Sequence, residues 1–290
     1  MKKIIITGAS GLVGSHLIPL LAKTCEIHVL SRKKPLTLIN NIRYHIVDLS
    51  KEVDYSKLPN KIDAIVYLAQ SDNYKNFPEK AVDVFNVNTS QVLYMLDYAR
   101  GAGARTFIYA SSGGVYGLSE SKIEISEKTL IPANGKLGFY PTTKLCSEIL
   151  AESFAPYMNI ALLRFFFVYG KEQKRSMLIP RLVDNVRAGE SILLHGQNGI
   201  KINPIHASDA VYAIKAALSL EGSHKINVAG PDVLSLREIC ELIGVNLGIQ
   251  PNYQIDQTKE PQNLIGDIEN MKKYLCEPRC HFEEGMIDLI

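Results

Sequence analysis

The sequence feature that most constrains the fold is a glycine-rich segment near the N-terminus. The apolar run Lys3–Thr7 leads into Thr7-Gly8-Ala9-Ser10-Gly11-Leu12-Val13-Gly14, which opens a helix candidate over Leu12–Ala22. Glycines there permit a tight turn, let a pyrophosphate approach the backbone, and let helix and strand pack closely. The free amides and positive dipole end of the helix then attract phosphate. A tight turn without a ligand is the alternative. The segment predicts a dinucleotide site at Gly8, Ser10, Gly11, Leu12, Val13 and Gly14.

The first half of the chain alternates short apolar, β-branched runs with helical stretches, which is typical of a parallel sheet covered by helices. The strands that we expect are Lys3–Thr7, Ile27–Leu30, Tyr44–Val47, Ala64–Leu68, Thr106–Ala110 and Ile160–Phe167. The helices that we expect between them are Leu12–Ala22, Val82–Arg100 and Tyr140–Phe154. The fold class predicted is α/β, with a Rossmann-type doubly wound parallel sheet.

Beyond about residue 170 the loops lengthen and Pro and Gly become more frequent, although the capping box Ser235–Glu238 still marks one clear helix start. We therefore predict an NAD(P)-binding domain over residues 1–167 and a smaller, irregular substrate-binding domain over residues 168–290. The second domain looks too irregular for an independent core. We expect Ala207–Leu220 to pack back on the first domain.

Composition excludes several classes of protein. The chain has 290 residues, 46% hydrophobic and 21% charged, with a net charge of +2, which is typical of an ordinary globular protein without a basic face for nucleic acid. The apolar runs are far shorter than the ~20 residues that a membrane-spanning helix needs. Five scattered cysteines do not form a secreted disulfide framework, so we expect a cytoplasmic protein.

A metal site is the one alternative that the cysteines raise. The segment Cys276–His281 gathers three soft donors but lacks a fourth ligand and the tight cysteine spacing of a zinc site. We predict no metal there and an ordinary loop.

The end of the second predicted strand bears on which dinucleotide fits. An acidic residue there would bind a free ribose 2′-hydroxyl, whereas this chain has Ser31-Arg32-Lys33-Lys34. A hydroxyl and three cations suit a 2′-phosphate, so we predict NADP, with NAD as second choice; a basic surface loop is the alternative. Asp48-Leu49 closes the third strand, where the carboxylate either meets the adenine amine or caps a helix.

Tyr140 and Lys144 are four residues apart at the start of a predicted helix, so both project from one face. A phenol has a pKa near 10, and lowering it to 7 takes about 4 kcal/mol of preferential stabilisation of the phenolate. A nearby ammonium and a nicotinamide cation can supply this in a dry cleft. Ser111 and Ser112 end the fifth strand, at the edge where such sheets bind ligands. A serine there can hold a substrate oxygen while Tyr140 transfers its proton.

With these motifs in place, the sequence resembles the extended short-chain dehydrogenase/reductase family, in its NAD(P)-dependent epimerase/dehydratase group, over nearly the whole chain. The resemblance implies that Ser112 orients the substrate, that Tyr140 is the acid/base, and that Lys144 binds the nicotinamide ribose and lowers the tyrosine pKa. The motifs that carry it are the glycine turn, Asp48-Leu49, Leu68-Ala69, Asn86-Val87-Asn88, Ser111–Gly117, Tyr140 with Lys144, Leu163-Arg164, Val168-Tyr169-Gly170 and Pro204–Asp209. The cofactor-lining residues that it implies are Leu68, Ala69, Asn86 and Ser111.

The resemblance also implies a substrate class and an assembly. Members of the family act mostly on nucleotide sugars seated between two domains. They are often homodimers joined through helices equivalent to Val82–Arg100 and Tyr140–Phe154.

Departures from the family pattern narrow the function. Gly113 and Gly114 stand where the family's dehydratases carry Asp-Glu, which argues against sugar 4,6-dehydration; we assign Gly113 to the substrate. Phe167 replaces an Asn, and Ile202 replaces an Arg, that grip a diphosphate in epimerases. Cations that can substitute are Lys201, Lys174, Arg175 and Arg181, although a Lys does not reproduce a bidentate Arg. We assign Phe167 and Lys201 to the substrate site.

The sequence therefore predicts an NAD(P)-dependent oxidoreductase or epimerase that acts at a secondary alcohol or ketone of a sugar, with a nucleotide sugar favoured. Two alternatives stay open: a reductase of a non-sugar carbonyl compound, and a non-catalytic NAD(P)-sensing protein. The second is disfavoured because Ser112, Tyr140 and Lys144 are all present.

Overall fold

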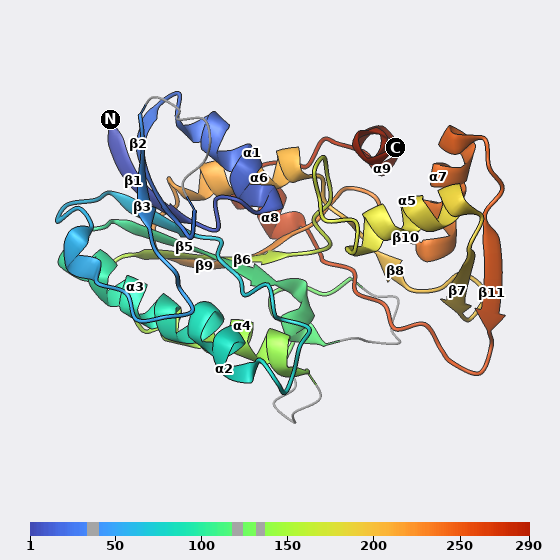
Figure 1. Ribbon diagram of the computed structural model, residues 1–290, viewed down its shortest axis with the longest axis horizontal. Helices are drawn as coiled ribbons and strands as arrows, with labels where there is room; N and C mark the ends of the chain where they lie inside the picture. The colour runs from blue at the N-terminus through green and yellow to red at the C-terminus, as the bar shows by residue number, and fades with distance from the viewer. Residues whose placement is uncertain (34–40, 118–123, 132–136) are drawn as a thin grey trace. The chain divides into compact units, whose positions relative to one another are not determined.

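A seven-stranded sheet determines where a ligand site can form (Figure 1). In the computed structural model, residues 1–33, 41–117, 124–131 and 137–290 are described. The strand order is β3-β2-β1-β4-β5-β6-β9, so β1 (Lys2–Thr7) lies between β2 (Cys25–Ser31) and β4 (Ala64–Tyr67). β1 pairs with both in parallel, and its last residue lies opposite Leu30 and Tyr67. Because the strand order reverses at β1, the carboxyl ends of these strands form the crevice in which such sheets bind ligands.

The predicted strands match observed ones apart from one or two residues at their ends. The remaining strands of the sheet are β3 (Ile42–Ile46), β5 (Thr106–Ser112), β6 (Asn159–Phe165) and β9 (Ser223–Val228). Helices α1 (Leu12–Leu21), α3 (Gln91–Gly101) and α4 (Phe139–Glu152) cover the sheet, with α1 on one face and α3 and α4 on the other (Figure 1). The α/β fold class is confirmed. The sequence did not predict β9, whose first half is polar.

The predicted helix Val82–Arg100 is interrupted. It consists of α2 (Ala81–Phe85), a π-helical turn η2 (Asn86–Ser90) and α3. Side chains from neighbouring elements bind backbone carbonyls inside the turn: Tyr67 Oη donates to Val87 O at 2.6 Å, and Ser147 Oγ to Asn88 O at 2.6 Å. These bonds compete with the helical ladder, which explains why the turn widens there.

By backbone proximity the chain groups into two compact units. Unit 1 contains residues 1–115, 132–164 and 214–226, and unit 2 contains residues 116–131, 165–213 and 227–290. The predicted boundary after residue 167 lies close to Phe165, where unit 2 resumes. Helix α6 (Ala207–Ala217) is divided between the units after Ala213. The predicted return of Ala207–Leu220 onto the first domain stays a prediction.

Unit 2 has a hydrophobic core of its own, contrary to our expectation. Residues of α5 (Leu178–Ala188), β7 (Ser191–His195) and α7 (Leu236–Leu247) are buried together in it. The expectation was wrong because short strands separated by Pro and Gly gave a weak periodic signal, whereas α5 and α7 each bury a continuous apolar stripe. The predicted capping box at Ser235 and Glu238 is present.

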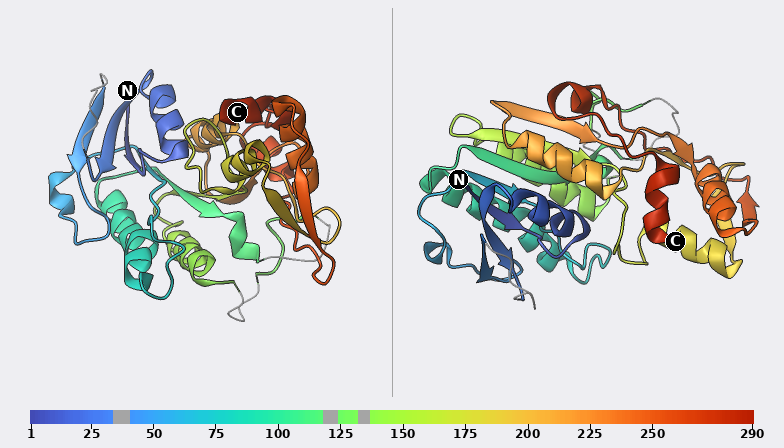
Figure 2. Two further views of the ribbon diagram at one scale, coloured as in Figure 1. Left: turned by 45° about the vertical axis from the view of Figure 1, so that its right-hand side comes forward. Right: turned by 90° about the horizontal axis from the view of Figure 1, so that it is seen from above.

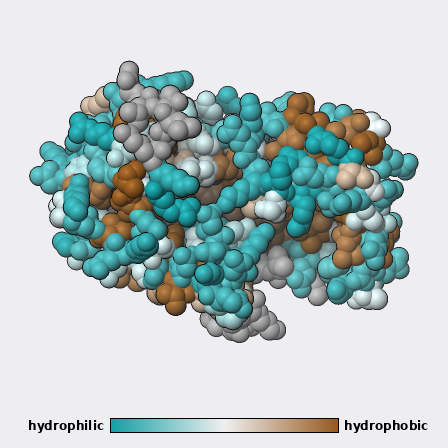
Figure 3. Space-filling view, in the orientation of Figure 1, coloured by the Kyte–Doolittle hydropathy of each residue, from teal (hydrophilic) through white to brown (hydrophobic). Residues whose placement is uncertain are grey.

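The other elements are short. They are η1 (Tyr55–Lys57), η3 (Gly113–Tyr116), β8 (Lys201–Ile202), β10 (Leu234–Ser235), β11 (Asn252–Asp256), α8 (Glu269–Tyr274), α9 (Phe282–Gly285) and η4 (Met286–Leu289). β10 pairs with β8, and β11 with β7, as two-stranded sheets (Figure 2). Among the described residues, no helix is long and apolar enough to span a membrane. The face shown in Figure 3 scatters apolar side chains among hydrophilic ones.

Candidate active site

Two glycines make the turn after β1 possible. Gly8 has a φ of +71°, and a Cβ there would lie 2.6 Å from Leu68 C and 2.7 Å from Ala69 N. At Gly14 a Cβ would lie 2.4 Å from Gly8 O. Ala69 N also donates to Thr7 Oγ1 at 3.1 Å, so the ends of β1 and β4 are held together. Any larger residue at either glycine would displace backbone rather than a side chain.

The start of α1 fits a pyrophosphate. Its N-cap is Gly11, no side chain caps its amides, and its first turn has no acidic residue. A Cβ at Gly11 would approach only Gly8 O, at 3.3 Å, so this glycine is not required by the turn's own packing. Open amides, a positive dipole end and a bare backbone are what a phosphate needs. Ser10, Leu12 and Val13, which we predicted to contact the dinucleotide, lie at the start of this helix.

At the end of β2 the Arg32 guanidinium is paired with a carboxylate. Ser31 Oγ donates to Lys33 O at 2.6 Å, and Arg32 Nη2 donates to Asp72 Oδ2 at 2.7 Å. Asp72 was not predicted as a partner of Arg32, because it lies 40 residues away in the sequence. Lys34 lies outside the described residues.

Asp48 begins a turn in the structure and does not cap a helix, since the next helical segment starts at Tyr55 and is capped by Asp54. Its Oδ1 accepts from Ser50 N at 3.0 Å and from Ser50 Oγ at 2.8 Å, and these bonds lower the pKa of its carboxyl. Asn86 Nδ2 reaches Ser50 O at 3.4 Å, so two predicted cofactor residues meet at this loop. The next residue, Leu49, is buried. The predicted contact of Asp48 with adenine stays a prediction.

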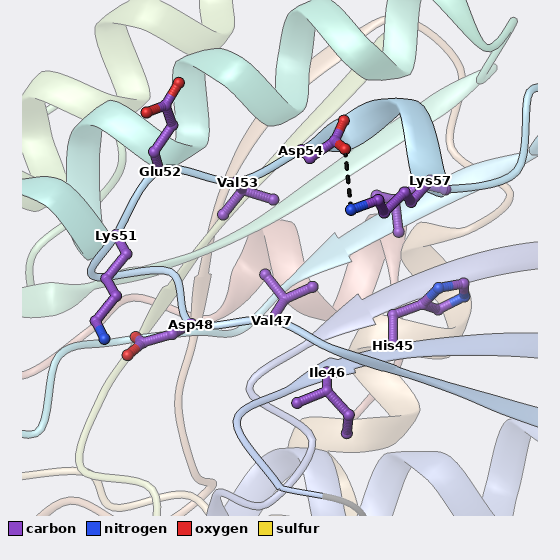
Figure 4. Close-up of a pocket in the computed structure, with 10 residues that line it drawn as sticks. His45, Ile46, Val47, Asp48, Lys51, Glu52, Val53, Asp54 and Lys57 are labelled. Carbon is purple, nitrogen blue, oxygen red and sulfur yellow. Dashed lines mark ion pairs between the residues drawn. The ribbon is translucent and has the colours of Figure 1, made fainter.

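A cavity of about 390 Å³ adjoins Asp48 (Figure 4). It is lined by residues of β3 and the following loop, and Figure 4 shows Lys51 turned toward Asp48, and the Asp54–Lys57 ion pair at 3.2 Å. None of Ser112, Tyr140 and Lys144 lines it. The cavity is therefore distinct from the place where the predicted catalytic residues meet.

The structure brings the three predicted catalytic residues together. β5 ends at Ser112, and α4, which carries Tyr140 and Lys144, begins at Phe139. The end of β5 and the start of α4 both lie at the carboxyl edge of the sheet. The Ser112 hydroxyl is hydrogen-bonded to Tyr140, and its oxygen accepts from Gly114 N at 3.1 Å. Lys144 Nζ donates to Ala110 O at 2.8 Å and lies 6.0 Å from the Tyr140 ring centroid. Gly113 follows Ser112 in η3.

The pKa values of Tyr140 and Lys144 are shifted away from those that proton transfer by a tyrosine beside a charged lysine would need. Burial raises the pKa of Tyr140 above its ordinary value, and the hydrogen bond with Ser112 opposes this only in part. Burial lowers the pKa of Lys144 to about 7, against the opposing influence of Glu148. Without a bound ligand, Lys144 therefore does not lower the pKa of the Tyr140 phenol toward 7. A further cation is needed for that.

Ser111 and Ser112 have different surroundings. The buried hydroxyl of Ser111 donates to Glu148 Oε1, away from Tyr140. Glu148 accepts from Arg164 Nε at 3.0 Å and from Arg164 Nη2 at 2.6 Å. This buried ion pair joins α4 to β6 and fixes the helix that carries Lys144. The predicted contact of Ser111 with the cofactor stays a prediction.

Sequence reasoning missed Gln70, which touches the central tyrosine. Tyr140 Oη donates to Gln70 Oε1 at 2.8 Å, and the Tyr74 ring lies 5.2 Å from the Tyr140 ring. Both residues follow β4 on the loop that leads toward α2. Gln70 stands two residues beyond the predicted strand Ala64–Leu68, and a polar residue at the carboxyl end of a parallel strand is a signal that could have found it.

The predicted substrate residues Phe167 and Lys201 belong to unit 2. Phe167 has a φ of +44°, in the left-handed region that Asn tolerates better than Phe. Lys201 lies on β8, where its N–H donates to Asn263 Oδ1 at 2.8 Å. Of the other cations considered, Arg175 pairs with Asp184. The roles of Phe167 and Lys201 toward a substrate stay predictions.

The loop Cys276–His281 is held by carboxylates that lie far from it in the sequence. The amides of Arg279 and Cys280 both donate to Asp209 Oδ2 at 2.8 Å. His281 Nδ1 lies 2.8 Å from Asp232 Oδ1. Within the part of the chain that the structure describes, no group of three His, Cys, Asp or Glu side chains is arranged to hold a metal ion.

The comparisons with known proteins agree with this site. The pattern of the NAD dependent epimerase/dehydratase family matches residues 4–229, so the chain belongs to that family. Over 310 residues it is 26% identical to an uncharacterized UDP-glucose epimerase, YtcB, of Bacillus subtilis (strain 168), covering 99% of this chain and 96% of YtcB. Over 302 residues it is 26% identical to a dTDP-4-dehydro-6-deoxy-D-allose reductase of a Streptomyces species, covering 94% and 90%.

A solved structure is similar as well. MoeE5, in complex with UDP-glucuronic acid and NAD, has a TM-score of 0.83 and 25% identity, covering 99% of this chain and 97% of MoeE5. The predicted family, the Rossmann-type fold and the enzyme class are thereby confirmed. Dependence on a nicotinamide dinucleotide follows from the family; the choice between NAD and NADP is a separate question.

Proposed function

We propose that this chain is an NAD(P)-dependent epimerase or ketoreductase that acts at a secondary alcohol or ketone of a nucleotide sugar. The observation that carries the proposal is the meeting of Ser112, Tyr140 and Lys144 at the sheet edge beside the phosphate turn. The names of YtcB and of the allose reductase, and the ligands of MoeE5, support a nucleotide sugar.

The residues divide the work of proton transfer. The Ser112 hydroxyl, held by Gly114 N, can donate a hydrogen bond to the substrate oxygen and fix its position. Tyr140 then gives or takes the proton of that oxygen. Lys144, held by Ala110 O, lies close enough to favour the phenolate when its ammonium is charged. A bound nicotinamide would supply hydride acceptance and donation, and the residues of the phosphate turn would hold the dinucleotide.

A second candidate is a reductase of a carbonyl compound without a nucleotide. It is favoured by Ile202, which stands where epimerases of the family often have Arg and which is fully buried in the core of unit 2. A buried isoleucine cannot bind a diphosphate. Phe167 likewise replaces an amide. A non-catalytic sensor is disfavoured because the catalytic constellation is complete.

We propose NADP as the first choice of cofactor and NAD as the second, because Arg32 and Lys33 follow Ser31 at the end of β2. The ion pair of Arg32 with Asp72 opposes this preference. We also propose a cytoplasmic location, since all five cysteines are free.

A homodimer is supported by exposed apolar side chains on α2 and α4, including Val82 (73% exposed) and Ile149 (58% exposed).

The test replaces Tyr140 by Phe. We expect turnover of UDP- or dTDP-sugars, or of a ketone panel, to fall at least a hundredfold, because the proton donor is lost. The affinity for NAD(P)H should stay within a few-fold, as followed by cofactor fluorescence. Wild-type turnover in the variant would contradict the catalytic role. Activity on ketones alone would favour the second candidate.

A further inference from the structure

A carboxylate stands beside the end of β2 although the strand itself supplies none. Asp72 belongs to the loop after β4, and its Oδ2 accepts from Arg32 Nη2 at 2.7 Å. The strands that these two residues follow, β2 and β4, lie on opposite sides of β1. The ion pair therefore connects the two flanks of the phosphate turn.

The segment leading to Asp72 is anchored at two points. Ala69 N donates to Thr7 Oγ1 at 3.1 Å, and Ser71 N donates to the buried Asn88 Oδ1 at 3.1 Å. Asn73 N, on the other side of Asp72, donates to Ser71 Oγ at 3.0 Å. The position of Asp72 is thus fixed by backbone contacts to the sheet edge and to the π-helical turn, and does not depend on the ion pair alone.

The charges around Arg32 argue against binding of a 2′-phosphate at the end of β2. Besides Asp72, the carboxylates of Asp48 and Asp83 act on Arg32 at longer range and raise its pKa. A ribose 2′-hydroxyl binds to a carboxylate, whereas a 2′-phosphate carries nearly two negative charges and needs a cation. Asp72 occupies the cation and adds a negative charge at the same place.

We propose that Asp72 is a specificity-determining residue that works against NADP. It draws Arg32 away from a 2′-phosphate and offers the ribose 2′-hydroxyl of NAD the carboxylate that β2 lacks. The inference rests on the proposed dinucleotide function and concerns only the choice between the two cofactors. It also implies that Arg32 favours NADP only when its ion pair with Asp72 is broken.

The experiment measures dissociation constants of NAD⁺ and NADP⁺ by calorimetry, without substrate. Asp72→Asn should tighten NADP⁺ binding about tenfold, because a charge repelled by the 2′-phosphate is removed at close range. It should weaken NAD⁺ binding a few-fold, because the carboxylate offered to the ribose 2′-hydroxyl is lost. In the double variant with Arg32→Ala most of the NADP⁺ gain should vanish, and high salt should reduce it.

Asp97→Asn is the matched control, since Asp97 also forms an exposed ion pair, with Arg100 at 2.8 Å, but on α3. It should change neither constant. Equal changes of both constants in Asp72→Asn, or a gain that survives Arg32→Ala, would overturn the role of Asp72 while leaving the dinucleotide function intact. Failure of the wild-type protein to bind either dinucleotide would overturn both.

Discussion

Lys144 shows how burial prepares a residue for catalysis. Its side chain is 2% exposed, packs 4.9 Å from the Tyr109 ring centroid, and has one backbone carbonyl as acceptor. Burial disfavours its charged form and lowers its pKa to about 7. At neutral pH the residue is therefore poised between ammonium and amine. A nearby negative charge, such as a phenolate, would shift it toward the ammonium.

This burial has a cost that depends on pH. A lysine whose pKa is lower in the folded than in the unfolded state does not destabilise the fold at pH values above its unfolded pKa of about 10.4. The destabilisation is largest at pH values at and below the folded pKa. Relative to the wild-type protein, Lys144→Met should gain stability as the pH falls from 10 to 7, on the order of 3 kcal/mol. Urea unfolding of both proteins at the two pH values measures the difference.

Lys57→Met is the control for loss of a lysine as such, because the Lys57 side chain is 81% exposed. If the stability difference between Lys144→Met and the wild-type protein were the same at both pH values, Lys144 would not carry a depressed pKa in the folded state.

Phe167 is a second residue whose role cannot be inferred from its type. Its φ of +44° is costly for a bulky side chain and cheap for Asn. The backbone at Phe167 therefore has a conformation that would suit an Asn better than a Phe. An outlier of this kind is typical of functional sites, and it supports the proposal that Phe167 contributes to substrate choice.

At the scale of elements, the turn between β1 and α1 depends on two backbone approaches that only glycine permits. Gly14 is the sharper case, since its φ is ordinary and its sequence position is helical, where Ala is normally favoured. The obstacle is Gly8 O, which would lie 2.4 Å from an added Cβ.

We predict that Gly14→Ala loses about 2 kcal/mol or more of stability and weakens NAD(P)H binding, because the turn must open to admit the methyl group. Gly101→Ala is the matched control: Gly101 is the last residue of α3, and an added Cβ would meet nothing within 4 Å. That variant should be neutral or gain about 0.5 kcal/mol. Thermal melts and cofactor fluorescence measure both effects; equal behaviour of the two variants would contradict the packing argument.

The π-helical turn η2 has a comparable role in positioning. Asn88 inside it donates through Nδ2 to Thr143 Oγ1 at 3.1 Å and accepts through Oδ1 from Ser71 N. One buried side chain thus links α4, which carries Tyr140 and Lys144, to the loop that carries Gln70 and Asp72. A regular helix would turn Asn88 elsewhere, so the interruption is part of the site's construction.

At the scale of the whole molecule, the exposed apolar residues of unit 1 bear on assembly. Val82 and Phe85 on α2, Tyr94 on α3 and Ile149 on α4 are each more than two-fifths exposed. Helices α3 and α4 cover the same face of the sheet (Figure 1). Apolar residues gathered over adjacent helices support the proposed homodimer.

We predict that the wild-type protein sediments with a mass near twice the 32.2 kDa of one chain, and that Val82→Glu shifts it toward one chain, because a buried charge would be unpaired at the interface. Val245→Glu on α7 is matched in residue type and exposure, 77% against 73%, and should leave the mass unchanged. Analytical ultracentrifugation distinguishes these outcomes. A wild-type monomer, or dissociation by both variants alike, would contradict the proposed interface.

The sequence alone determined the fold class, the phosphate turn and the Tyr140–Lys144 pair, because each depends on local spacing: a strand period, a helix turn, glycines between them. The tertiary structure decided which side chains surround these groups. Arg32 meets Asp72 across 40 residues, and Tyr140 meets Gln70 across 70. Glu148 meets Arg164 in the interior, and unit 2 forms a core from segments with weak periodicity. Such contacts depend on how strands are ordered in the sheet, which local spacing does not encode.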